Sequence, residues 1–320
     1  MKTAFLGFDT SNYRTSAAAV TAEGEILFNA RKLLPVAPGE RGLRQNEAVF
    51  LHVKQMREIL PGLREALRGV KVAAVTASSR PRSREDSYMP VFQVGDTIAC
   101  SIAAAMDVPS FLTDHQQGHI AAAAHGTALE GAERFLALHL SGGTTELLLR
   151  ERNSLTELGG TLDLQAGQLV DRAGVAMGMR FPAGPELEVL ARRGRAEGRL
   201  GCSMAEGDLK CHFSGAETRI RQWIAEDALP REDIAREVYD LLARTIARML
   251  KAGQARTGVS DALIAGGVAA SELFREELAR RCAGRGLPLK LVFGDPELCG
   301  DNAVGVALIG AQQYLNGGAL

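Results

Sequence analysis

The first part of the chain alternates between short apolar runs and polar turns, separated by two longer stretches with helical periodicity. Short apolar runs bounded by turn residues predict buried strands, and apolar positions that repeat every three to four residues predict helices. The expected strands lie at residues 4–9, 16–20, 26–28 and 70–76. The expected helices lie at residues 47–67, where Pro61 could break the helix, and at residues 91–106.

The second part of the chain repeats this order. The expected strands lie at residues 135–140, 146–150 and 155–160, and the polar turn 141–145 joins the first two. Helices dominate residues 164–250, a strand follows at 262–265, and a last helix is expected at 302–314. Because strand, polar turn, strand, strand recurs about 135 residues later, we predict two similar α/β lobes facing a cleft. Their expected bounds are residues 1–130, joined by the C-terminal helix 302–320, and residues 131–301.

Composition is that of a soluble globular protein with two cores: 320 residues, 46% hydrophobic and 23% charged. No run of 18 apolar residues is present, and no secretory signal follows Met1, so we expect neither a membrane span nor export. Five cysteines are widely spread, which is typical of reduced thiols in a cytosol. The net charge of −1 gives no overall basic field, so any nucleic-acid binding must use local patches or a partner subunit.

A histidine pair is the first candidate for chemistry. His115 and His119 are four residues apart, so on a helix both imidazoles face the same side and could bind one divalent metal ion. Asp301, near the end of the chain, could complete the set of ligands. A chance pair among six histidines is the alternative. A metalloprotease is disfavoured because Gln116 occupies the position where that helix motif needs a glutamate base.

Two glycine pairs are the second candidate. Gly142-Gly143 and Gly266-Gly267 each follow an apolar strand directly. Glycine lets the backbone approach a phosphate closely and offer its N–H groups, although a tight turn that needs positive φ explains the same residues. Asp9, at the end of the first strand, could hold a metal or water near such phosphates, or cap a turn.

Five ordered motifs together resemble the TsaD family, the threonylcarbamoyl transferases of tRNA modification, with its archaeal and eukaryotic counterparts. The motifs are residues 7–11, 115–119, 140–143, 264–268 and 301–302. Weaker matches lie at His52, at Asp171 with residues 182–185, and at the Phe-Ser-Gly segment 213–215. The similarity spans nearly the whole chain.

The resemblance implies an actin-like, two-lobed ATPase fold, built from duplicated ribonuclease-H-like lobes around a central cleft. It implies an iron or zinc ion held by His115, His119 and Asp301, with Asp9 as a catalytic residue. An adenine nucleotide, either ATP or AMP or an acyl-adenylate, is expected at Ser141, Gly142, Gly143, Asp171, Gly184, Gly266, Gly267 and Ser271. The implied activity moves a threonylcarbamoyl group to N6 of the adenosine beside the anticodon. The implied partners are tRNA and a TsaB-like homologous subunit, in the cytoplasm.

Several positions depart from the family pattern. Tyr13-Arg14 replaces an acidic pair, and Thr144 replaces a histidine. Ser271 stands where an asparagine is expected, Glu217 where a lysine is expected, and residues 78–86 replace a glycine-rich loop. These changes favour a divergent paralogue. The alternative function is a nucleotide-binding paralogue that acts as an ATPase, a regulator or a scaffold, or that transfers a different carbamoyl-type group.

Two arginine clusters could contact phosphates of a nucleotide or of RNA, although such runs are more often solvated surface. Their members are Arg80, Arg82 and Arg84 in the first, and Arg192, Arg193, Arg195 and Arg199 in the second.

Overall fold

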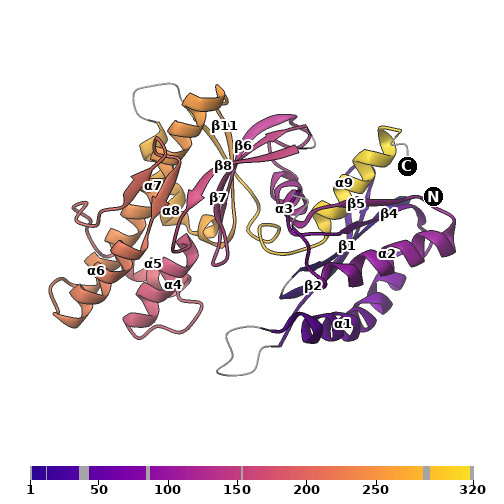
Figure 1. Ribbon diagram of the computed structural model, residues 1–320, viewed down its shortest axis with the longest axis horizontal. Helices are drawn as coiled ribbons and strands as arrows, with labels where there is room; N and C mark the ends of the chain where they lie inside the picture. The colour runs from indigo at the N-terminus through magenta and orange to yellow at the C-terminus, as the bar shows by residue number, and fades with distance from the viewer. Residues whose placement is uncertain are drawn as a thin grey trace. The chain divides into compact units, whose positions relative to one another are not determined.

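The computed structural model describes residues 2–11, 13–35, 43–83, 87–152, 154–283 and 289–317. The chain forms two compact units (Figure 1). The first unit consists of Met1–Gly126 and Glu297–Leu320, and the second consists of Thr127–Pro296. The expected boundary at residue 301 therefore differs from the one observed. Asp301 belongs to the first unit, together with His115 and His119.

The first unit is built on a five-stranded sheet with the order β3-β2-β1-β4-β5. Its strands are β1 (Thr3–Ser11), β2 (Arg14–Thr21), β3 (Ile26–Leu33), β4 (Lys71–Ser78) and β5 (Ser110–Thr113). β1, β2 and β3 form an antiparallel meander, whereas β4 and β5 continue the sheet in parallel. β1 and β4 are buried almost throughout, as expected for strands with helices on both faces of the sheet.

Two helices cover each face of this sheet. α1 (Gln45–Ala66) and α2 (Phe92–Met106) pack on the face that carries Leu6 and Phe8. α3 (His115–Ala124) and α9 (Val304–Leu315) lie on the other face, where Phe5 packs against α9. The expected break at Pro61 is wrong, because Pro61 lies on the exposed side of α1 while its buried residues continue past it to Leu63.

The second unit is built on a seven-stranded sheet with the order β12-β11-β6-β7-β8-β10-β9. Its strands are β6 (Arg134–Leu140), β7 (Thr145–Glu151), β8 (Ser154–Thr161), β9 (Ser203–Ala205), β10 (Lys210–His212), β11 (Asp261–Ala265) and β12 (Lys290–Phe293). Its helices are α4 (Ala166–Ala176), α5 (Gly184–Ala191), α6 (Ser214–Ala225), α7 (Arg231–Thr257), the short 3₁₀ turn η1 (Gly267–Ala270) and α8 (Glu272–Cys282). One large apolar cluster holds these elements together, with the long helix α7 as its main component.

The two sheets share one topology. Strands β8-β7-β6-β11-β12 of the second unit repeat the order and directions of β3-β2-β1-β4-β5 in the first. In both, an antiparallel meander is extended by two parallel strands. The duplicated strand order predicted from the sequence is therefore present. No helix in the described ranges is long and apolar enough to cross a bilayer.

Candidate metal centre and nucleotide cradle

The three predicted metal ligands converge in the first unit. His115 and His119 lie one turn apart on α3, and Asp301 lies just before α9. The Nε2 atom of His119 is 3.0 Å from Nε2 of His115 and 3.0 Å from Oδ1 of Asp301. Nε2 of His115 lies 3.9 Å from the same carboxylate oxygen. One donor atom from each residue thus falls within 4.8 Å of the others, the only such group of three found among the described residues.

Asp114 fixes the start of the helix that presents these imidazoles. Its carboxylate accepts a hydrogen bond from the backbone N–H of Gln117 at 2.8 Å, which caps α3. A side-chain oxygen at this position satisfies one of the free N–H groups of the first turn. His115 therefore begins a well-defined helix. The four-residue spacing then places the imidazoles of His115 and His119 on the same side of that helix.

Asp9, two residues before the end of β1, holds the first imidazole. Its Oδ2 accepts a hydrogen bond from Nδ1 of His115 at 2.6 Å, and Asp9 is almost fully buried. Burial opposes a charge on the imidazole, but the Asp9 carboxylate outweighs it and raises the pKa of His115 to about 9. With Nδ1 bonded to Asp9, Nε2 is the ring atom that faces His119 and Asp301, and a metal ion would bind there in place of its proton. A carboxylate that orients a histidine in this way is the usual support of a metal ligand.

The third ligand is held by charge. Burial acts to raise the pKa of Asp301, but its hydrogen bond to His119 and the positive charges of the imidazoles and of Arg14 keep that pKa well below its usual range. Ser11, at the end of β1, donates a hydrogen bond to Oδ2 of Asp301 at 3.4 Å. The carboxylate is therefore ionised, as a metal ligand must be.

The donor set fits a divalent transition metal. Two nitrogen donors about 2.0–2.1 Å from a tetrahedral zinc ion lie roughly 3.3 Å apart, close to the separations found here. Two imidazole nitrogens facing each other at 3.0 Å also need a proton or a cation between them. Two nitrogens and one carboxylate leave coordination positions open for other ligands.

In the second unit, the predicted Gly142-Gly143 turn follows β6. The Ser141 hydroxyl accepts hydrogen bonds from the backbone N–H groups of Gly143 and Thr144, at 3.3 and 3.0 Å, which closes a tight turn. Behind it, a Cβ added to Gly167 would lie 2.6 Å from the backbone N of Gly142. A Cβ on Gly142 or Gly143 would meet open space. A tight turn is therefore present, but neither glycine is among those with positive φ, so positive φ does not explain them; both leave the outer side of the turn open to a ligand.

The Gly266-Gly267 turn lies beside it. β6 and β11 are parallel neighbours, paired at His139 and Ala265, so their carboxyl ends share one sheet edge. Gly266 has φ 97°, and a Cβ there would lie 2.1 Å from the carbonyl oxygen of Leu140. Gly266 is therefore required by close packing, whereas a Cβ on Gly267 would meet nothing.

The other predicted nucleotide residues have structural partners. Asp171 accepts a hydrogen bond from the backbone N–H of Ala183 at 2.8 Å. The Gly184 carbonyl accepts one from the Tyr239 hydroxyl at 3.1 Å, and Ser271 caps α8. Asp171 lies within α4, Gly184 begins α5, and Ser271 is the N-cap residue of α8. Their roles in nucleotide binding stay predictions.

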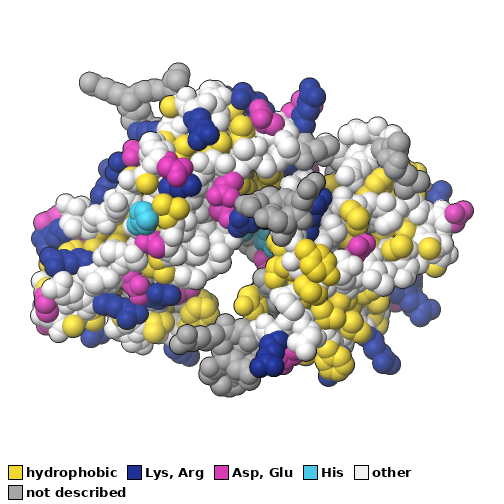
Figure 2. Space-filling model, in the orientation of Figure 1, with side chains coloured by type: hydrophobic (Ala, Val, Ile, Leu, Met, Phe, Trp, Pro, Cys, Tyr) yellow, Lys and Arg dark blue, Asp and Glu magenta, His cyan; other side chains and the backbone are white. Residues whose placement is uncertain are grey.

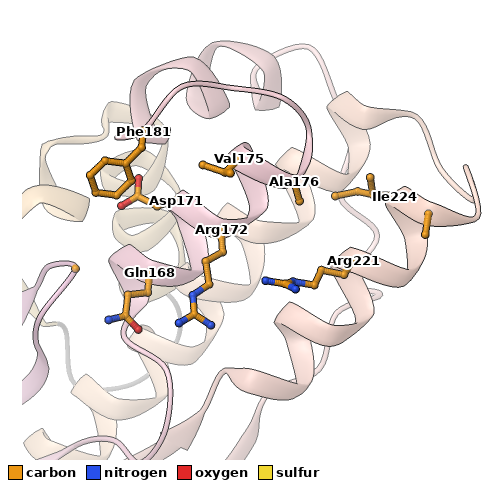
Figure 3. Close-up of a pocket in the computed structure, with 10 residues that line it drawn as sticks. Gln168, Asp171, Arg172, Val175, Ala176, Phe181, Arg221 and Ile224 are labelled. Atoms are coloured by element: carbon orange, nitrogen blue, oxygen red, sulfur yellow. The ribbon is translucent and has the colours of Figure 1, made fainter. Parts of the chain in front are cut away.

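A pocket of about 780 Å³ opens in the second unit (Figure 3). It is lined by Gly142, Gln168, Asp171, Arg172, Val175, Ala176, Phe181, Arg221, Ile224 and Ala225. Only Gly142 and Asp171 were singled out from the sequence. Arg172 of α4 and Arg221 of α6 both extend into the space between their helices and form ion pairs with Glu217 at 3.1 and 2.9 Å. The spacing of Gln168, Arg172 and Val175 along one side of α4 was the available signal, but it resembles a solvated helix face.

Two of the four arginines in the second cluster pair with carboxylates. Arg192 pairs with Glu188, Glu272 and Glu276 at 3.3 to 3.5 Å, and Arg199 pairs with Glu197 at 2.6 Å. In the first cluster, Arg84 lies outside the described residues. Phosphate contact by either cluster stays a prediction.

Solved structures resembling this chain have low sequence identity and the same architecture. HypF in its phosphate- and nucleotide-bound form superposes with a TM-score of 0.61 at 11% identity, over 99% of this chain and 56% of that one. A ROK family glucokinase from Streptomyces griseus, in complex with glucose and AMPPNP, gives a TM-score of 0.54 at 15% identity, over 97% of this chain and 99% of that one. Both have the actin-like ATPase fold, so the predicted fold class is confirmed.

Sequence comparisons lead to one family. The family model of TsaD, tRNA N6-adenosine threonylcarbamoyltransferase, matches residues 89–308. A protein of that description from Symbiobacterium thermophilum is 31% identical over 95% of this chain and 90% of its own length. A probable bifunctional tRNA threonylcarbamoyladenosine biosynthesis protein from Methanocaldococcus jannaschii is 26% identical over 98% of this chain, which spans 56% of that longer protein. Such a family implies a transferase that binds a metal and a nucleotide. The chain therefore belongs to the TsaD family, the tRNA N6-adenosine threonylcarbamoyltransferases.

Proposed function

We propose that this protein transfers a threonylcarbamoyl group from its adenylate to N6 of the adenosine beside the anticodon of tRNA. One observation carries the proposal: in a chain of this family, His115, His119 and Asp301 bring their donor atoms within 4.8 Å of one another. The alternative, a paralogue that only binds nucleotide or acts as a scaffold, is not favoured by the family match.

The metal is proposed to be iron or zinc, held by the two imidazoles and the Asp301 carboxylate. When bound, it would supply a Lewis acid that polarises a carbonyl or phosphoryl oxygen. Asp9 acts on the ligands rather than on the substrate: its bond to His115 at 2.6 Å fixes the ring and its tautomer. Asp9 is therefore proposed as a positioning residue, which is narrower than the catalytic role expected from the sequence.

The nucleotide is proposed to bind in the second unit, at the nucleotide cradle. The nucleotide cradle consists of the turns Gly142-Gly143 and Gly266-Gly267 together with Asp171, which lines the adjacent pocket. The open outer sides of Gly142, Gly143 and Gly267 would let phosphate oxygens approach the backbone. In the reaction, the N6 amine attacks the carbamoyl carbon, a C–N bond forms, the C–O bond to the phosphate breaks, and AMP leaves while the amine loses a proton.

A second subunit of similar fold is also part of the proposal. α1 exposes Phe50 and Val53, which are 61% and 54% accessible, next to a groove of about 670 Å³. Apolar residues such as Met56, Leu60 and Ile98 line this groove together with the charged residues Arg57, Arg64, Glu65 and Arg68. Figure 2 shows hydrophobic side chains gathered on this side of the first unit. An exposed surface that combines apolar and charged residues is typical of a protein interface, and we propose a TsaB-like subunit as its partner. The cytoplasmic location is proposed because the substrate is tRNA.

The test is direct transfer. Purified protein, supplied with iron or zinc, would be incubated with threonylcarbamoyl-adenylate and an unmodified tRNA transcript, with and without the organism's TsaB-like subunit. Mass spectrometry of the digested tRNA should detect a threonylcarbamoyl adduct on adenosine. The adduct should disappear in His115→Ala and persist in His212→Ala, a histidine of the second unit. Metal-loaded protein that forms no adduct with any subunit combination would refute the proposal.

A further inference from the structure

Arg14 lies on the same face of the first hairpin as the metal centre. It begins β2 and pairs directly with Ser11, the last residue of β1. Cross-strand partners project from the same face of a sheet, and alternate residues along a strand do too. Ser11 contacts Asp301 and Asp9 contacts His115, so the face that carries both of them also carries Arg14. Thr10 and Thr15 turn to the opposite face, where they bond Val91 and His52.

The guanidinium of Arg14 runs alongside the loop that supplies Asp301. A Cβ built on Gly300 would lie 3.8 Å from Nη1 of Arg14. Arg14 is thus close enough to act on whatever binds beside the Asp301 carboxylate.

Arg14 nevertheless has no partner of its own in the described part of the chain. Its Nε–H is buried without a hydrogen-bond acceptor, and no ion pair within 4.0 Å is formed among the described residues. Buried charged donors are almost always satisfied, and leaving one unsatisfied is costly. An acceptor is therefore missing at this point.

Arg31 gives the contrast. It lies on β3, and its Nη1 would be 3.9 Å from the same Cβ on Gly300. Unlike Arg14, it donates a hydrogen bond to the backbone carbonyl of Glu297 at 2.7 Å. Arg31 therefore supports the loop and has an acceptor within the protein. Arg14 lies beside the same loop but has no such acceptor among the described residues.

We propose that Arg14 is a specificity-determining residue that binds an oxyanion of the substrate, a carboxylate or a phosphate, next to the metal centre. Guanidinium groups bind both oxyanions through paired hydrogen bonds. Asp301 forms its ion pairs with His115 and His119, so the guanidinium of Arg14 remains available to the ligand. The inference rests on the proposed function, because a threonylcarbamoyl-adenylate carries one carboxylate and one phosphate.

The test separates the two oxyanions by calorimetry on zinc-loaded protein. N-carbamoyl-L-threonine offers the carboxylate alone, and AMP offers the phosphate alone. The variants are Arg14→Gln, which removes the charge, and Arg14→Lys, which keeps the charge but cannot form the paired hydrogen bonds of a guanidinium. Arg31→Gln is the matched control. One ligand should bind about 10- to 100-fold more weakly to Arg14→Gln, the range for a lost charge-assisted hydrogen bond, should recover partly in Arg14→Lys, and should be unchanged in Arg31→Gln.

Metal affinity, followed by the visible absorption of bound cobalt, tells this role from a merely structural one. It should stay within a few-fold of wild type in both Arg14 variants. If both ligands bind the Arg14 variants as tightly as wild type, or if ligand and cobalt affinity fall in parallel, the proposal is overturned. This proposal and the proposed function can fail separately. If the protein binds a ligand through Arg14 but modifies no tRNA, only the proposed function is refuted. Arg14→Lys keeps the test valid if Arg14→Gln does not fold.

Discussion

The β1–β2 hairpin of the first unit and the β6–β7 hairpin of the second occupy the same place in two copies of one topology, yet they carry different chemistry. The first turn is flanked by ionisable side chains, Asp9 and Arg14, which lie at the metal ligands. The second turn is Ser-Gly-Gly-Thr, with open space beyond both glycines. One hairpin presents side chains and the other presents its main chain.

This difference means that different kinds of contact hold the two sites together. The proposed metal centre is held by specific contacts, such as the 2.6 Å bond of Asp9 to His115. The nucleotide cradle is held by close backbone packing, such as that of Gly266 against Leu140, and leaves its binding surface open. A substitution should therefore damage the first site through lost ligand chemistry and the second through lost shape.

The largest effect is expected from His119→Ala. Removing one of three protein ligands should weaken metal binding by more than about 100-fold, beyond the loss seen when a supporting residue alone is changed. Metal analysis after dialysis should find close to one ion per wild-type chain and almost none in the variant. Nucleotide binding by the second unit should be unchanged. Full metal occupancy in His119→Ala would remove His119 from the site.

The second prediction tests the shape of the cradle. Gly266→Ala should lower the free energy of unfolding by roughly 2–4 kcal/mol, because it adds backbone strain at positive φ and a clash with a carbonyl oxygen. Gly267→Ala is the matched control, since its Cβ meets nothing, and its stability should match wild type. Chemical denaturation measures both. Equal stability of the two variants would contradict the packing argument.

A smaller effect, on metal affinity, is expected from Asp9→Asn in the first hairpin. The amide keeps the size of the side chain but loses the charge that fixes His115. Metal affinity should fall by about 10- to 100-fold, the usual cost of losing a partner of a ligating histidine. Competition with a chelator measures the change. If transfer activity is lost while metal affinity stays at the wild-type value, Asp9 acts on the substrate, as first expected from the sequence.

Much of this arrangement could be predicted from the sequence because it depends on local periodicity. The duplicated strand order follows from apolar runs and turns of similar spacing. The pairing of His115 with His119 follows from helical geometry, and the tight turns at the glycine pairs follow from their position after strands. Asp301 could be suggested only by its residue type and motif, since nothing local links it to residues nearly 200 positions earlier.

The remainder depends on register and tertiary packing. Arg14 reaches the metal face only because it pairs with Ser11 across the turn. Arg172 and Arg221 line a pocket only because α4 packs against α6. The short strands β5, β9, β10 and β12 were not predicted, since three or four residues carry too little periodicity to distinguish a strand from a loop.

The smallest effect is a pH dependence of stability. It arises on the face of the first hairpin that carries Thr15, and the second hairpin has no corresponding prediction. His52 of α1 is fully buried and bonds Thr15 of β2 through Nδ1 at 2.8 Å. Burial lowers the pKa of His52 to about 4, although the Ser11 carbonyl and the charge of Asp9 act in the opposite direction. The fold therefore favours neutral His52: this stabilisation is complete above the unfolded pKa near 6.5 and is lost as the pH falls toward 4. Between pH 7.5 and pH 5, wild type should lose about 1–2 kcal/mol more stability than His52→Gln. Urea denaturation across this range measures the difference, and parallel pH profiles would show that His52 titrates in the fold as it does in the unfolded chain.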